Sequence, residues 1–460
     1  MRYTVAVTLT LALFLCLSTG AAYAQADEPG PLRVGIATVD VTPDSPALMR
    51  GFGGRNRPSE GVAKNILAQA VVFDNGQTRV ALVAVDHCWI EYRQALDLRT
   101  AAEAAGIPQQ HLMINFSHNH YGPFFTACVD RSPGFNLEYD VLFKQRTDPL
   151  LAAAVEDLKP ALLDYTVGSS TMAINRRQLD DENKWVGMRP EPRKQIDPDV
   201  PVLRVLTPEG EVRAVIFGYA CHPTTISGQM QYLIGTDFPG HARDWIAAAY
   251  PDAEAVFLQG FAGDIKPRAI RPRPGLTPSR FGGVLVDELQ TKQAVGWELG
   301  RAVLAAVSVP PPPVPADRPK DLEQALATPV TLGGVLELVD LPTSPTDPAK
   351  MTPVPFHMGA LRIGDVYMFC GQGEILSSMA LRIKRNMPDM RVWTNAYCHT
   401  IGGSYIGDAE SWDEGGYEAG RYAPQAEDVL VSHAMQFIRG LQYQPIHTDP
   451  IPRTHPTYCP

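Results

Sequence analysis

Apolar runs of two kinds alternate along the first part of the chain and predict strands and helices in turn. Residues 69–86 contain two short apolar runs around Asn75-Gly76, a pair that favours a tight β-hairpin. Residues 92–108 have the spacing of a helix that ends in glycine and proline, and residues 111–117 are again a short apolar run. This order of strand, helix and strand predicts an α/β fold in which helices flank a mixed β-sheet core.

The same alternation continues through the rest of the chain. We expect strands at 212–223 and 253–264, and helices at 148–160, 239–251, 293–309 and 426–441. A proline-rich stretch at 310–319 could link two domains, but strand-like sequence resumes soon after it. We therefore expect a surface crossover at this stretch, within a single domain that spans residues 25–460.

The N-terminus has the features of an export signal. Arg2 precedes an apolar run from about Val5 to Leu17, and Ala22-Tyr23-Ala24 follows. These features predict a cleaved signal peptide over residues 1–24 and a secreted or periplasmic protein. The alternative is a membrane anchor, but the run is short for a bilayer span of about 20 residues. We expect no transmembrane segment after signal removal.

Charge and cysteine content bear on the partners and the disulfides that we expect. The net charge is −10 and no long basic run is present, which argues against nucleic acid as a partner. An exported protein can oxidise its cysteines, so one or two disulfides are expected, although the pairing does not follow from the sequence. Without Cys16 of the signal peptide, the cysteines are Cys88, Cys128, Cys221, Cys370, Cys398 and Cys459.

Polar side chains recur where the apolar strands end. In α/β sheets the carboxyl ends of strands share one edge, so these side chains should form a single site. The strand ends carry Asp86-His87, His118-Asn119-His120, Cys221-His222, Asp264 and Glu374.

Four of these side chains fit a zinc site at the strand carboxyl ends. His118 and His120 would point to one face of a strand, and His222 with Glu374 would complete a set that leaves room for water. Each residue also has a structural explanation. The histidine pair is a pattern that arises by chance, His222 could be a loop or core histidine, and Glu374 could be an acid at a helix N-terminus.

Several motifs resemble, in order, those of the neutral/alkaline ceramidase-like family, over roughly residues 33–440. They are VGIATVDVTPDSPALMRGFGGR, SHNHYGP, GYACHPTTI, QGFAGDIKP, GQGEILSSMALRIKR and SYIGDAESWDEGGYE. The resemblance implies a Zn²⁺ cofactor and a role for each matching residue. Its implied zinc ligands are His118, His120, His222, Glu374 and Tyr405.

The resemblance also implies residues that act on the substrate. Tyr417 would lie near the substrate amide, and Arg176 matches an arginine in the family's Asn-Arg-Ser segment, where this chain has Arg177 in place of the serine. When water attacks the substrate carbonyl, the oxyanion that forms would be stabilised by Tyr417, Arg176 or the zinc ion. Asp86 and Asp264 could orient the zinc-binding histidines or, equally, cap helices and turns.

Two departures from the family pattern bear on the chemistry. The family's Gly-Asp-x-Ser-Pro turn reads GDIKPR here, so that Lys266 replaces a serine once proposed as a nucleophile. This favours attack by zinc-activated water and places a cation at the site if Lys266 points inward; the alternative is a solvent-exposed lysine. The C-terminal β-sandwich domain of ceramidases is not expected in this chain.

Three hypotheses for the function follow. The first is a secreted zinc hydrolase that cleaves an amide bond of an N-acyl lipid or another N-acylated small molecule by means of zinc-activated water. The second keeps the fold and the zinc but acts on an ester or glycosidic bond of a non-ceramide substrate, because function resides in the site and not in the fold. The third is a non-enzymatic envelope protein that binds a ligand in the same pocket. The oligomeric state stays open.

Overall fold

The computed structural model describes residues 30–125, 136–225, 229–268, 288–308, 322–344, 354–400 and 405–443. The expected signal peptide, the proline-rich stretch, Cys128 and Cys459 lie outside these ranges. Within them, no helix combines the length and the apolar character needed to cross a membrane.

The first sheet contains the predicted hairpin. Its strand order is β5-β4-β3-β1-β6, with β4 and β5 parallel and the other pairs antiparallel. Asp74 of β3 pairs with Arg79 of β4 across the Asn75-Gly76 turn, which confirms the hairpin. The strands are β1 (Arg33–Asp40), β3 (Leu67–Asp74), β4 (Arg79–Val85), β5 (Leu112–Phe116) and β6 (Lys159–Pro160).

Two further four-stranded sheets follow along the chain. The second has the order β14-β12-β11-β7 and the third β16-β17-β18-β20, and in each a single pair, β12/β14 or β18/β20, is parallel. Their strands are β7 (Leu162–Ser169), β11 (Asp199–Leu206), β12 (Val212–Tyr219), β14 (Glu254–Gln259), β16 (Leu332–Leu341), β17 (Val354–Ile363), β18 (Val366–Gly371) and β20 (Arg391–Asn395). The mixed α/β class is confirmed, and its core consists of several sheets.

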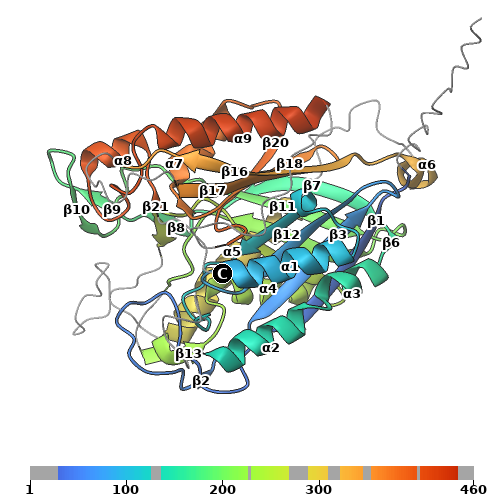
Figure 1. The fold of residues 1–460 in the computed structure, drawn as a ribbon, viewed down its shortest axis with the longest axis horizontal. Helices are drawn as coiled ribbons and strands as arrows, with labels where there is room; N and C mark the ends of the chain where they lie inside the picture. Colours follow the sequence, from blue (N-terminus) through green and yellow to red (C-terminus); the bar gives the residue numbers. More distant parts are fainter. Residues whose placement is uncertain are drawn as a thin grey trace, which may run out of the picture.

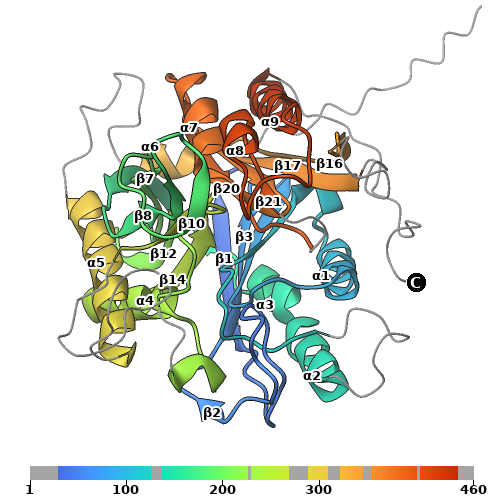
Figure 2. The same ribbon diagram turned by 90° about the vertical axis from the view of Figure 1, so that its left-hand side faces the viewer.

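Helices cover the outer face of each sheet (Figures 1 and 2). The first sheet packs against α1 (Tyr92–Ala104), α2 (Leu137–Thr147) and α3 (Leu150–Glu156), and the second against α4 (Phe238–Ala249) and α5 (Glu288–Ser308). The third sheet lies under α9 (Ala426–Tyr443), beside which α7 (Ser377–Arg385) packs. Short helices are α6 (Leu322–Ala327) and α8 (Ala409–Glu414).

The central core lies where the three sheets meet. In β4, Leu82 joins a buried cluster with Ile216 of β12 and Met368 of β18, whereas its neighbour Val83 joins the cluster between sheets and helices. Because successive side chains of a strand point to opposite faces, a strand buried on both faces is apolar throughout. This accounts for the continuous apolar runs seen in the sequence.

One buried side chain ties the three sheets together at the ends of their strands. Asn115 of β5 donates from Nδ2 to the carbonyl oxygens of Gln259 (3.2 Å) and Ala396 (2.8 Å), and its Oδ1 accepts from the Gln259 amide (2.8 Å). Gln259 ends β14 and Ala396 follows β20. The ends of β5, β14 and β20 therefore meet at a single point.

Short strand pairs extend from this point. They are β2 (Gly61–Val62) with β13 (Leu233–Ile234), β8 (Ala173–Asn175) with β15 (Ile265–Pro267), β9 (Arg177–Leu179) with β10 (Trp185–Met188), and β19 (Glu374–Ile375) with β21 (Tyr405–Ile406). The 3-10 turns are η1 (Gln109–His111) and η2 (Gln229–Tyr232).

The cysteines within the described ranges do not form disulfides. Cys88, Cys221, Cys370 and Cys398 are all buried with free thiols. The expected disulfide is therefore wrong for these four residues, since the large core orders the chain around them without a cross-link. Cys128 and Cys459 lie outside the described residues.

Candidate metal centre

The histidine pair after β5 lies in a turn beyond the strand. β5 ends at Phe116, and His118 has φ +57°, a left-handed conformation that non-glycine residues rarely adopt. Our expectation that strand alternation aligns His118 with His120 is wrong, because both residues follow the strand. The turn instead brings their Nε2 atoms to 3.1 Å from each other.

His222 and Glu374 reach the same point from the other two sheets. His222 follows β12 of the second sheet, and Glu374 follows β18 of the third and opens β19. Glu374 Oε2 lies 3.3 Å from Nε2 of His118 and 3.0 Å from Nε2 of His222. The fold thus brings together the three histidines and the glutamate that the sequence analysis singled out.

Backbone carbonyls orient two of the imidazole rings. His118 Nδ1 donates to the carbonyl oxygen of Cys88 (2.9 Å), and His222 Nδ1 donates to that of Ala262 (2.6 Å). With a proton held on Nδ1, the Nε2 atoms of His118 and His222 face Oε2 of Glu374. Histidine ligands of metal ions are usually held by such a hydrogen bond from the second ring nitrogen.

These donor atoms fit a zinc ion. Adjacent ligand atoms of a tetrahedral site with bonds of about 2.0–2.1 Å lie about 3.3 Å apart, close to the spacings found here. Lone pairs of His118 and His120 that face each other at 3.1 Å repel unless a cation or a proton lies between them. Two sets of three side chains could hold a metal ion, His118 with His222 and Glu374, and Cys88 with His118 and His120. The set with Cys88 is the weaker one, because His118 Nδ1 already donates to a carbonyl.

The electrostatics of the cluster favour a bound cation. Burial lowers the pKa of His222 to about 3, so that its imidazole is neutral at physiological pH. Burial would raise the pKa of Glu374, but His118 and His222 outweigh this effect and hold it well below its ordinary value. Burial also opposes charge on His118, yet Cys88 and Glu374 raise the pKa of His118 to about 10. The cluster thus attracts positive charge even without a metal ion.

Gly51 supports His120, and the sequence analysis missed it. A Cβ at Gly51 would lie 2.3 to 2.7 Å from atoms of the His120 side chain, and its φ of +109° also favours glycine. Phe52 packs its ring against the same imidazole, with centroids 5.0 Å apart. The glycine-rich stretch GFGG was the available signal, but nothing in the sequence linked it to a histidine almost seventy residues away.

Tyr405 and Arg176 lie beside Glu374. Tyr405 pairs with Glu374 across β19 and β21, and its hydroxyl lies 3.0 Å from Nη2 of Arg176. Burial, and then Glu374, raise the pKa of Tyr405 well above its ordinary value. Tyr417 packs its ring on Tyr405 with centroids 5.2 Å apart and is 57% exposed, so it lies on the solvent side of this group.

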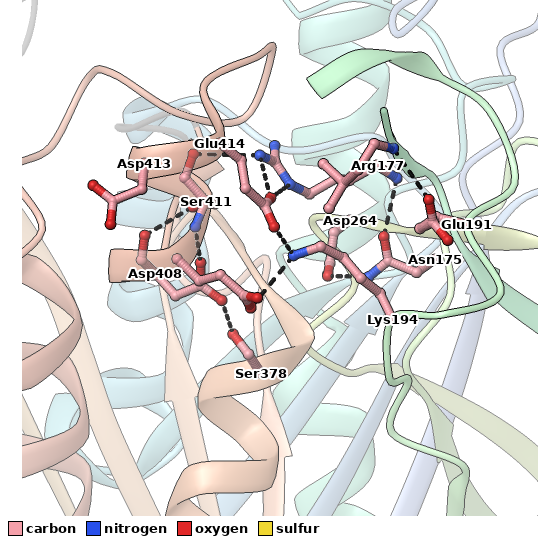
Figure 3. A network of polar contacts seen from close by, with 12 residues as sticks. Asn175, Arg177, Glu191, Lys194, Asp264, Ser378, Asp408, Ser411, Asp413 and Glu414 are labelled. Atoms are coloured by element: carbon pink, nitrogen blue, oxygen red, sulfur yellow. Dashed lines mark hydrogen bonds and ion pairs between the residues drawn. The ribbon is translucent and has the colours of Figure 1, made fainter. Parts of the chain in front are cut away.

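Arg177 anchors the segment that carries Tyr417. Its buried guanidinium donates to Glu414 (Nη2, 3.0 Å), to Glu418 (Nη1, 2.6 Å) and to the carbonyl oxygen of Gly415 (Nη2, 2.7 Å). Figure 3 shows Arg177 and Lys194 on either side of Glu414. Glu418 also accepts from Arg176 Nε (3.0 Å), so the two arginines share one carboxylate.

The two candidate aspartates contact residues of the scaffold. Asp264 accepts hydrogen bonds from the Ser377 amide (2.9 Å) at the start of α7 and from Asn175 Nδ2 (2.6 Å; Figure 3). Asp86 pairs with Arg243 and accepts from the Leu67 amide (3.0 Å). These contacts favour capping and cross-linking over orientation of the histidines.

Lys266 is buried, which corrects the alternative of a solvent-exposed lysine. Only 4% of the residue is exposed, and it pairs with Ile174 across β8 and β15. Burial, and then the nearby Arg176, lower the pKa of Lys266 to about 7. The lysine therefore stands next to the arginine that contacts Tyr405.

Comparisons with known structures show which fold the chain has. The structure of neutral ceramidase from Pseudomonas aeruginosa superposes with a TM-score of 0.73 at 18% identity, covering 92% of this chain and 76% of that one. The chain has the neutral ceramidase fold. A structure of a ceramidase complexed with C2 also gives a TM-score of 0.73 at 18% identity, over 92% of this chain and 77% of that one. No protein-family model matches the sequence, and no match is found among curated proteins. At this identity the ceramidase fold is shared, and the chemistry has to be argued from the side chains.

Proposed function

We propose that the protein is a zinc-dependent hydrolase that cleaves the amide bond of an N-acylated substrate. The observation that carries the proposal is the position of Glu374 Oε2, which lies 3.3 Å from Nε2 of His118 and 3.0 Å from Nε2 of His222. Nε2 of His120 lies 3.1 Å from that of His118. The fold shared with two ceramidase structures also supports the proposal. Zinc held by these residues, with Tyr405 as a further ligand, would supply Lewis-acid activation of water and of the substrate carbonyl.

The residues around the centre suit an oxyanion that develops at the substrate carbonyl. Burial opposes charge on Arg176, but Tyr405 and Glu418 outweigh it and raise the pKa of Arg176 above its ordinary value. Arg176 therefore stays cationic, and its Nη2 donates to the Tyr405 hydroxyl. Tyr417 lies outside Tyr405, where its hydroxyl can donate to a substrate that enters from solvent. Preorganised donors of this kind stabilise charge that appears only in the transition state.

Lys266 favours a second candidate, in which the same apparatus cleaves an ester or glycosidic bond of a non-ceramide substrate. The lysine is buried beside Arg176, at the position where the ceramidase resemblance expects a serine. Two neighbouring basic side chains favour a substrate that carries an anionic or strongly polar group, which the apolar chains of a ceramide do not supply.

A substrate panel tests both candidates. The zinc-loaded protein is incubated with short-chain ceramides, N-acyl amino acids, carboxylic esters and aminoglycosides, and Glu374→Gln serves as the inactive control. Turnover of an N-acyl compound by the wild type but not by the variant supports amide hydrolysis. Turnover confined to esters or glycosides supports the second candidate. Hydrolysis that persists in Glu374→Gln, or after removal of zinc, contradicts both.

We also infer that the protein acts outside the cytoplasm. The support is the N-terminal apolar run followed by Ala22-Tyr23-Ala24. N-terminal sequencing of the protein recovered from the periplasm and the medium of a bacterial host tests this. A mature chain that begins at or near Gln25 is expected, and an uncleaved Met1 in a cytoplasmic fraction contradicts it.

A further inference from the structure

Tyr397 lies inside the candidate metal centre, and neither the sequence analysis nor the proposed mechanism uses it. Its ring stacks on the His118 imidazole with centroids 4.3 Å apart and planes inclined by 30°. The ring meets His222 edge-on at 5.9 Å. The side chain is 3% exposed, so the phenol belongs to the wall of the centre.

The hydroxyl of this tyrosine is buried without a hydrogen-bond partner among the described residues. A buried polar group that lacks a partner is costly, and most such groups in folded proteins are satisfied by protein, water or ligand. Tyr219, another buried tyrosine, shows the usual arrangement, since its hydroxyl donates to the Ser170 carbonyl oxygen at 2.9 Å.

The backbone at Tyr397 is also held in an unfavourable conformation. Its φ is +56°, in the left-handed region that a bulky side chain rarely adopts. Hydrogen bonds from the Phe116 amide to the Tyr397 carbonyl (2.9 Å) and from the Tyr397 amide to the Gly373 carbonyl (3.0 Å) fix this conformation. Phe116 ends β5 and Gly373 precedes Glu374, so the strand ends that carry the ligands also place this phenol.

A tyrosine hydroxyl can donate one hydrogen bond, and its ordinary pKa of about 10 keeps the proton in place at physiological pH. The rings that contact Tyr397 belong to His118 and His222, two of the candidate metal ligands.

We propose that the Tyr397 hydroxyl donates a hydrogen bond to an oxygen atom of the molecule that binds at this centre. In the substrate, this atom is the carbonyl oxygen. The ligand class is an oxygen-rich group that can approach a metal ion, such as an amide carbonyl, a carboxylate or a hydroxamate. The inference rests on the proposed function for the nature of the substrate. The unpartnered hydroxyl and its place against His118 do not depend on it.

The test uses Tyr397→Phe, which removes the hydroxyl alone and keeps the ring. Acetohydroxamate serves as the probe, and its affinity for the zinc-loaded protein is measured by calorimetry, with zinc content measured alongside. We expect unchanged zinc content and affinity for the probe that is weaker by about tenfold, the effect of one hydrogen bond. We also expect an unchanged or raised melting temperature, because the variant loses only an unpartnered polar group.

Two controls separate this role from a structural one. Tyr219→Phe removes a hydroxyl that has a partner, so its melting temperature should fall. Tyr165→Phe alters a tyrosine on β7 that packs on Trp393, and it should bind the probe like the wild type.

Two results would overturn the inference. A lower melting temperature for Tyr397→Phe would show that its hydroxyl has a structural partner, and equal affinity of variant and wild type for the probe would show that it donates nothing. Either result overturns the inference while the proposed function stands. If the wild type binds zinc but not acetohydroxamate, the inference fails, whereas the proposed function fails only if the substrate panel shows no zinc-dependent turnover.

Discussion

Nε2 of His222 lies 3.0 Å from Oε2 of Glu374, although 152 residues of chain separate them. One residue follows a strand of the second sheet and the other a strand of the third. Their contact requires that both sheets end at the same place, which the Asn115 side chain secures by joining the ends of β5, β14 and β20. The metal centre is thus a product of how three sheets are arranged.

The first prediction concerns metal content. The purified protein should carry one zinc ion per chain, and His222→Ala or Glu374→Gln should weaken zinc binding by about 100-fold or more, because each removes one of few donors. Atomic emission spectrometry and competition with a chelating dye measure both quantities. Glu60→Gln alters an exposed carboxylate paired with Arg57 and should retain the metal. Full zinc content in Glu374→Gln would show that the metal binds elsewhere.

The second prediction concerns Gly51, where a methyl group would collide with the His120 ring. Gly51→Ala should weaken zinc binding by about 10- to 100-fold, as changes to groups that support metal ligands typically do. Gly54→Ala lies in the same glycine-rich stretch with no atom within 4 Å of the added Cβ, and should bind zinc normally. Dye competition on the two variants measures the difference. Equal zinc affinities would mean that Gly51 does not hold the ring in place.

The third prediction concerns pH. Burial raises the pKa of Asp264 to about 6, so the folded protein binds this proton more tightly than the unfolded chain does. The resulting stabilisation is fully present below pH about 3.9 and is lost as the pH rises through 6, by up to about 3 kcal/mol. The variant Asp264→Asn has an amide at this position, which does not titrate. The free energy of unfolding of the wild type, minus that of the variant, should therefore decrease between pH 4 and pH 7 in urea titrations. A constant difference would contradict the raised pKa.

The fourth prediction concerns Arg177, which binds Glu414 and Glu418 in the interior. Arg177→Ser should lower the free energy of unfolding by about 3 kcal/mol or more, because it leaves buried carboxylates with fewer cations. It should also increase hydrogen exchange of the amides in residues 409–418. Urea titration and mass spectrometry measure the two effects. Arg193→Ser removes a solvent-exposed partner of Glu191 and should leave both nearly unchanged. Unaltered exchange in Arg177→Ser would show that the segment is held by other contacts.

The local pattern of apolar and polar residues predicts individual helices and strands, but it does not predict which strands pair in a sheet. The β3/β4 hairpin and helices α1, α4 and α9 follow from spacing, turn residues and helix ends, which act over a few residues. Sheet membership depends on contacts between distant strands, and no local signal separates one mixed sheet from three. The same limit explains why His118 and His120 were assigned to a strand face, since the left-handed turn at His118 is imposed by surrounding structure.

The residue types available to the site, and their places relative to strand ends, follow from the amino-acid sequence. His118, His120, His222 and Glu374 were found in this way, because polar side chains after apolar strands stand out in a linear chain. Which neighbours complete the site depends on how distant elements pack together. Gly51 behind His120, Arg177 between two glutamates and the unpartnered Tyr397 hydroxyl on His118 all depend on packing across elements. Such contacts form only when the sheets and loops have packed together, because they join residues that are far apart in the sequence.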